Sequence, residues 1–164
     1  LIASLEKFKK DNAGSAEAKD AEERIKILKS EKKIEAKDLP PPDYKFDKNG
    51  RHLAVMLLPV EGSEIEKIKE RIDNYNKAYH GNLKLSISAV LLNKETHMIS
   101  IKQFENSKTA LDYFSDFSKN RTSLKKINEL ENDFFVISYT NYALFFQDKR
   151  VENYLDFHKS TYEL

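Results

Sequence analysis

The sequence contains no cysteine, and only four of its 164 residues are glycine. The lack of cysteine excludes disulfide frameworks, thiol catalysis and zinc sites built from thiolates, but it leaves the compartment open. None of the glycines belongs to a glycine-rich loop of the kind that cradles phosphate groups. Nucleotide-binding motifs of that type are therefore excluded.

The chain also has no excess of one charge and no long apolar run. Lys and Arg total 28 against 27 for Asp and Glu, which gives a formal charge of +1 and argues against a nucleic-acid partner bound through a basic field. No apolar run approaches the roughly 20 residues of a membrane helix. The chain begins at Leu1 without a signal-peptide pattern, so we expect it to be a piece of a longer protein.

The side chains that most often carry catalysis or bind metals are scattered. No metal-ligand spacing relates the four histidines, which are His52, His80, His97 and His158. This pattern predicts surface or hydrogen-bonded histidines. The carboxylates of 61–70 follow the outer face of a predicted helix, where pairing with lysine is expected. We expect no enzymatic activity, no cofactor and no metal; an enzyme is a third alternative for which no reaction can be named.

Residues 1–36 are rich in Ala, Glu and Lys and carry apolar residues at helical spacing. They predict a helical hairpin, with a turn at Asp11–Gly14 and Ser15 as the N-cap of the second helix. The apolar stripe of this hairpin is narrow, so we expect it to pack against preceding helices. Residues 37–50 contain three consecutive prolines, which favour a stiff linker, and 51–164 are predicted to form a separate domain.

After the linker, the residue pattern is that of an α+β domain. Apolar and alternating runs predict four strands, at 52–59, 84–92, 97–104 and 134–139. Apolar residues three and four apart predict three helices, from Ser63 to Tyr79, from Asn106 through Leu130, and from Arg150 to Tyr162. Ser63 and Glu66 form a predicted capping box at the start of the first of these helices. The run Tyr142–Phe146 fits either a helical turn capped by Thr140 and Asn141 or an edge strand.

This order of strands and helices predicts a ferredoxin-like βαββαβ sheet domain with an added C-terminal helix. The first and fourth strands are apolar on both faces, so a second layer must cover the sheet. The C-terminal helix is the nearest candidate for that layer, and a partner chain or a self-dimer is the next. Residues 98–104 lack the basic and aromatic pattern of RNA-binding sheets, so no RNA partner is expected.

The middle two strands carry one polar row. Its members alternate with apolar residues and are Ser86, Ser88, Ser100 and Lys102. In the predicted fold they line an open sheet face, where hydroxyls and one cation can bind sugar hydroxyls or the backbone of a partner protein. Plain solvation of this face is an equal alternative.

A resemblance to a known family is carried by the segments Met98–Phe114, Phe135–Ser138, Asn141–Tyr142 and Val151–Phe157, together with Tyr162. These runs resemble the C-terminal domain of the tetratricopeptide-repeat lipoproteins of the type IX secretion and gliding-motility apparatus (the SprE and PorW group). Residues 8–25 are similar to the closing half of a tetratricopeptide repeat. The resemblance implies a periplasmic lipoprotein, anchored in the outer membrane by a lipidated cysteine upstream. It also implies a non-enzymatic link between secretion components, including the periplasmic ring and the translocon.

The third strand and the helix after it also resemble the second half of a sporulation-related repeat domain, a family that binds the glycan strands of peptidoglycan. The sequence departs from that pattern at Lys102–Phe104, where the family commonly has a glycine before the aromatic residue. Peptidoglycan binding is therefore the alternative function that we expect from the sequence.

Overall fold

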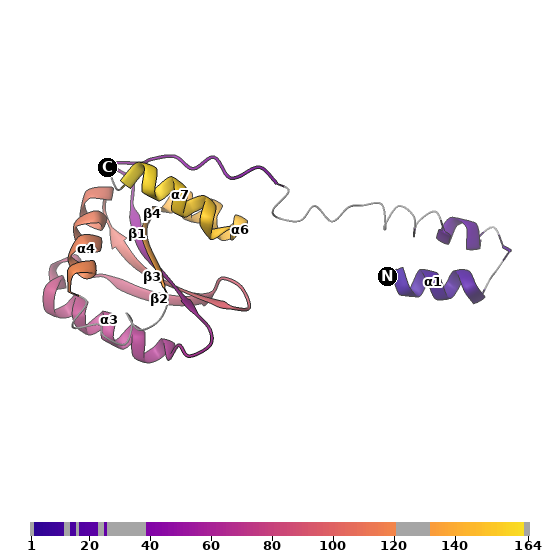
Figure 1. Cartoon of the computed structure of the whole chain (residues 1–164), viewed down its shortest axis with the longest axis horizontal. Helices are drawn as coiled ribbons and strands as arrows, with labels where there is room; N and C mark the ends of the chain where they lie inside the picture. Colours follow the sequence, from indigo (N-terminus) through magenta and orange to yellow (C-terminus); the bar gives the residue numbers. More distant parts are fainter. Residues whose placement is uncertain are drawn as a thin grey trace. The chain divides into compact units, whose positions relative to one another are not determined.

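The computed structural model describes residues 2–11, 14–15, 17–22, 25, 39–120 and 132–162. The chain divides into two compact units, Leu1–Leu39 and Pro40–Leu164, which are coloured along the sequence in Figure 1.

The first unit contains helix α1 (Ile2–Asp11) and a second helical segment at 17–22. The Ser15 hydroxyl accepts a hydrogen bond from the amide of Ala18 at 3.0 Å, as expected of the predicted N-cap. An ion pair of 2.9 Å between Lys9 and Glu22 joins the two segments. The rest of the predicted hairpin, at 1, 12–13, 16, 23–24 and 26–36, lies outside the described residues and includes part of the predicted turn.

The second unit is an α+β domain built on one four-stranded antiparallel sheet. Its strands are β1 (His52–Pro59), β2 (Ser86–Leu91), β3 (Thr96–Phe104) and β4 (Asp133–Ser138), in the sheet order β2-β3-β1-β4. Its helices are α3 (Ile65–Tyr79), the short 3-10 helix η2 (Gly81–Leu83), α4 (Ser107–Lys119), α6 (Tyr139–Asp148) and α7 (Val151–Tyr162). Strands and helices thus follow each other along the chain in the predicted order.

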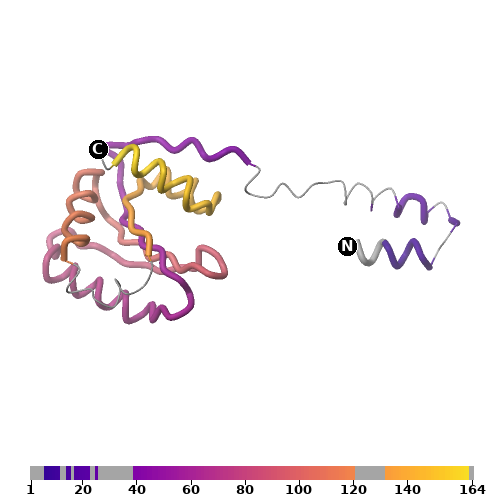
Figure 2. The backbone as a smooth tube through the Cα atoms, viewed as in Figure 1, coloured from indigo at the N-terminus to yellow at the C-terminus, as the bar shows by residue number. Residues whose placement is uncertain are grey.

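Helices cover both faces of the sheet, with α3 and α4 on one side and α6 and α7 on the other (Figures 1 and 2). Strand β1 is buried on both faces because its side chains alternate between two apolar cores. The core beneath α3 and α4 includes Ala54, Met56, Leu58, Ile72 and Tyr113. The core beneath α6 and α7 includes Leu53, Val55, Leu57, Phe145 and Tyr154. The predicted second layer is therefore the C-terminal helix, together with α6.

The helix starts differ from the sequence prediction in two places. Helix α3 begins at Ile65 without a side-chain cap, and the Ser63 hydroxyl makes no hydrogen bond within the described residues, so the predicted capping box is wrong. The run Tyr142–Phe146 is helical, and its helix is capped by Ser138, whose hydroxyl accepts from the amide of Asn141 at 3.2 Å. The start of α4 agrees with the prediction, whereas its predicted continuation to Leu130 lies outside the described residues.

The segment from Pro40 to Gly50, predicted to be part of a linker, belongs to the second unit. The Asn141 side chain accepts from the amide of Lys45 at 3.1 Å and donates to its carbonyl at 2.8 Å. The ring of Tyr44 stands edge-on to that of Tyr154, with 5.0 Å between the ring centres. Side-chain contacts therefore hold this extended segment against α6 and α7, and the folded unit begins earlier than the expected Arg51.

Candidate functional site

The predicted polar row is assembled by the pairing of β2 with β3. Ser86 lies opposite Lys102, and Ser88 lies opposite Ser100, so all four side chains are on the same side of the sheet. Ser86 is exposed, and Ser88 and Lys102 are half-buried. Ser100 is only 1% exposed, which corrects the expectation that it lines an open face. The row available to a ligand therefore consists of Ser86, Ser88 and Lys102.

An apolar side chain extends this row toward the hairpin turn. Val90 lies opposite the buried Met98 and is itself 43% exposed. We call Ser86, Ser88, Val90 and Lys102 the β2–β3 surface. Val90 could not be predicted as part of this surface, because an isolated valine in a strand carries no signal of its own exposure. Only the position of the covering helices decides it.

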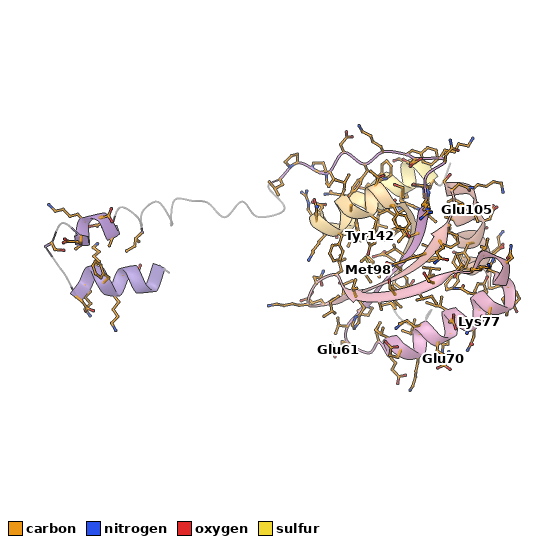
Figure 3. All side chains as sticks on the ribbon, turned by 180° about the vertical axis from the view of Figure 1, so that it is seen from behind. Glu61, Glu70, Lys77, Met98, Glu105 and Tyr142 are labelled. Carbon is orange, nitrogen blue, oxygen red and sulfur yellow. The ribbon has the colours of Figure 1, made fainter. Side chains whose placement is uncertain are left out.

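Helix α6 places an aromatic pair on the same side of the sheet. Tyr142 packs against the core that contains Met98, and Figure 3 labels both residues. The Tyr142 ring stacks on that of Phe146 with 6.2 Å between centres, and Phe146 is 39% exposed. The Lys149 ammonium group lies 5.5 Å from the centre of the Phe146 ring, which is within the range of a cation–π contact.

The backbone at one end of the β2–β3 surface is strained. Gln103 has a φ of 85°, in the region that favours glycine. The pairing of β1 with β3 shifts at this point, since His52 lies opposite Phe104 whereas Ala54 lies opposite Ile101. One extra residue is thus accommodated in β3, as in a β-bulge. The bulge directly follows Lys102.

Two of the four histidines, His52 and His158, make hydrogen bonds inside the second unit. The Nδ1 of His52 bonds the carbonyl of Gly50 at 2.7 Å, and its Nε2 bonds the Tyr162 hydroxyl at 3.0 Å. Burial lowers the pKa of His52, so its ring is neutral at pH 7. The Nε2 of His158 accepts from the amide of Val136 at 3.1 Å. These contacts tie the last helix to the start of β1 and to the edge strand β4.

Elsewhere, described residues of the second unit line two open grooves, among others. One, of about 590 Å³, lies where β1 ends and α7 begins, and is lined by Leu57, Pro59, Asp133, Val151, Glu152 and Leu155, among others. The other, of about 600 Å³, runs along α3. The described lining of neither groove includes a member of the β2–β3 surface. No group of three or more His, Asp or Glu side chains in the described part of the chain is arranged to hold a metal ion.

Comparison with known proteins found no family model, no curated protein and no solved structure that matches this chain. Within the described residues, every helix is too short or too polar to cross a lipid bilayer.

Proposed function

We propose that the chain is a non-enzymatic protein-interaction module and that the β2–β3 surface binds its partner. The observation that carries this proposal is the uneven cover of one side of the sheet. Helices α6 and α7 bury those side chains of β1 and β4 that point to this side of the sheet, whereas Val90 on β2 stays 43% exposed beside Ser86, Ser88 and Lys102. An uncovered apolar side chain beside hydrogen-bonding groups offers a partner protein both apolar and polar contacts, the combination that protein interfaces use.

The proposed setting comes from the resemblance described above. We propose a periplasmic lipoprotein of the outer membrane that supports type IX protein secretion and gliding motility, with components of the periplasmic ring or the translocon as partners. The sheet order β2-β3-β1-β4 supports a ferredoxin-like domain. The two helical segments joined by the pair of Lys9 and Glu22 support the end of a tetratricopeptide-repeat array at 1–36.

The test is capture of secretion components from periplasmic membranes by the purified chain. Replacing Ser88 and Lys102 by glutamate adds negative charge across the proposed surface and leaves the cores intact. Replacing Lys159 and Ser160 by glutamate, both exposed on α7, changes the net charge equally and serves as the matched control. We expect loss of capture by the first double variant alone. Equal capture by both variants, or capture of no such component by the parent chain, contradicts the proposal.

Peptidoglycan binding is a second candidate, favoured by the aromatic pair of α6. The exposed ring of Phe146 lies on the same side of the sheet as the serine hydroxyls, and sugar recognition combines aromatic surface with such hydrogen-bonding groups. Co-sedimentation with purified peptidoglycan tests this alternative. Binding by the parent chain that is lost in both Phe146→Ala and the Ser88 and Lys102 double variant supports glycan recognition over protein docking.

A further inference from the structure

The hydrogen bonds at the hairpin turn determine which backbone groups of β2 face outward. The amide of Leu92 donates to the carbonyl of Thr96 at 2.9 Å, so Leu92 faces β3. Because backbone groups alternate along an antiparallel strand, those of Val90, Ser88 and Ser86 also face β3. The backbone groups of Ile87, Ala89 and Leu91 then point away from β3, at the outer edge of the sheet.

The opposite edge of the sheet shows the same alternation of backbone groups. The amide of Tyr139 donates to the carbonyl of Arg51 at 3.0 Å, which places the backbone groups of Val136 on the outer side of β4. Both of these groups indeed bond side chains of α7: the amide donates to His158 and the carbonyl accepts from Tyr154. Helix α7 thus occupies the outer edge of β4.

Among the described residues, none covers the outer edge of β2 in a comparable way. In the part of the chain that the structure describes, no hydrogen bond reaches the outward groups of Ile87, Ala89 or Leu91. The six residues of β2 contain no charge and no proline, and their pairing with β3 has no bulge. Charged side chains, prolines and bulges are three features that normally prevent edge strands from pairing with other chains. An edge that lacks all three is suited to accept another strand.

We propose that β2 pairs antiparallel with β2 of a second copy of this chain, about a two-fold axis at Ala89. In this register Ala89 faces its own counterpart and Ile87 faces Leu91 of the second copy, twice. All outward groups of the two strands are then paired, which gives about six new hydrogen bonds. The proposal concerns the strand edge and stands independently of the β2–β3 surface, whose side chains lie on one face.

The side chains of β2 favour a second copy over an unrelated strand. Leu91 is 56% exposed, and in this register Ile87 of the other copy covers it. No like charges oppose each other within the strand, since it has none. Only at the ends does Lys84 lie opposite Lys94 of the second copy, so raised salt should strengthen association by screening this repulsion. The contact involves only the six residues of β2 in each chain, against roughly 20–30 residues a side in a stable interface, which predicts a weak dimer.

Sedimentation equilibrium of the 164-residue chain, up to millimolar concentration, tests the association. The variant Leu91→Lys places a charge in the contact, and we expect its dimer dissociation constant to rise at least about tenfold. Tyr79→Lys is the matched control because Tyr79 is a 62% exposed apolar side chain on α3. Lys102→Glu alters the β2–β3 surface but not the edge, and should dimerise like the parent. A parent chain that stays monomeric, or a Leu91→Lys variant that dimerises equally, overturns the proposal.

Cross-linking tests the register, since the chain has no cysteine of its own. A two-fold axis at Ala89 brings the two Cα atoms of this residue to about 5.5 Å. The Cα atoms of the two Leu91 residues are then about 14 Å apart, at a rise of about 3.4 Å per residue. A short bismaleimide should therefore join Ala89→Cys into a dimer much faster than the more exposed Leu91→Cys. If Leu91→Cys reacts as fast or faster, the proposed register is wrong. If a peptide from another protein protects Ala89→Cys and no dimer forms, a second copy of this chain is not the strand that pairs with β2.

Discussion

His158 accepts a hydrogen bond from the backbone amide of Val136 at the outer edge of β4. From the previous turn of the same helix, the Tyr154 hydroxyl donates to the carbonyl of Val136 at 2.8 Å. Two side chains of α7 thus satisfy the groups that a further strand would bind. All three residues are buried, so no water can replace these bonds at low cost.

The first prediction concerns this contact. His158→Ala leaves the buried amide of Val136 without an acceptor, which should lower the free energy of unfolding by about 1–3 kcal/mol beyond any loss of packing. Urea unfolding followed by circular dichroism measures this change. Tyr154→Phe keeps the ring and removes only the donor, so a loss of about 1 kcal/mol is expected there. Unchanged stability in both variants would mean that these bonds do not hold α7 on the sheet.

A second prediction tests the central position of β1. Leu57 is 3% exposed in the core beneath α6 and α7, so Leu57→Ala should cost about 2–5 kcal/mol through lost burial and a residual cavity. Val90→Ala, on the uncovered part of the same side, should cost about 0.5 kcal/mol or less. Similar denaturant midpoints for the two variants would contradict the burial of β1 on both faces.

The third prediction concerns pH. Burial lowers the pKa of His52 and that of His80, so the unfolded chain binds more protons than the folded one when these histidines titrate. The stability that these two histidines contribute should therefore be complete above about pH 6.5. The free energy of unfolding should decrease as the pH is lowered toward 5. Replacing both histidines by glutamine should flatten this dependence. Higher stability at pH 5 than at pH 7 in the parent chain would reverse the predicted sign.

Sequence patterns predicted those features that depend on a residue's own segment. The uninterrupted apolar run of 52–59 indicated a strand buried on both faces, and alternation placed Ser86, Ser88, Ser100 and Lys102 on one side. The burial of Ser100 could not be predicted in this way. It is set by tertiary packing, and alternation reveals the side of the sheet on which a residue lies but not how far the covering layer extends.

Features that depend on contacts distant in sequence were also missed. Three prolines favour an extended segment, which is correct locally, but no local pattern shows that Asn141 binds the backbone of Lys45 from 96 residues away. The positive φ of Gln103 could not be predicted from its residue type either, because glycine is the residue that normally occupies such a conformation.

This strained residue leads to the fourth prediction. Gln103→Gly removes the steric cost of a positive φ and should raise the free energy of unfolding by about 0.5–1 kcal/mol, after the greater freedom of glycine in the unfolded chain is subtracted. Gln103→Val should lower it, because a β-branched side chain tolerates this conformation least. The two denaturant midpoints should thus lie on opposite sides of the parent's. A stabilising valine would show that the bulge is not strained.

The last prediction concerns the boundary of the folded unit. A chain of residues 51–164 lacks Lys45, so the buried amide of Asn141 loses both of its backbone partners, and it lacks the edge-on contact of Tyr44 with Tyr154. Together these losses should lower the free energy of unfolding by about 2–4 kcal/mol relative to 40–164. Residues 1–39 form a separate unit, so 40–164 should unfold at the same urea concentration as the corresponding unit of the full chain. Equal stability of 51–164 and 40–164 would instead show that the proline segment is only a spacer. The folded unit would then begin at Arg51.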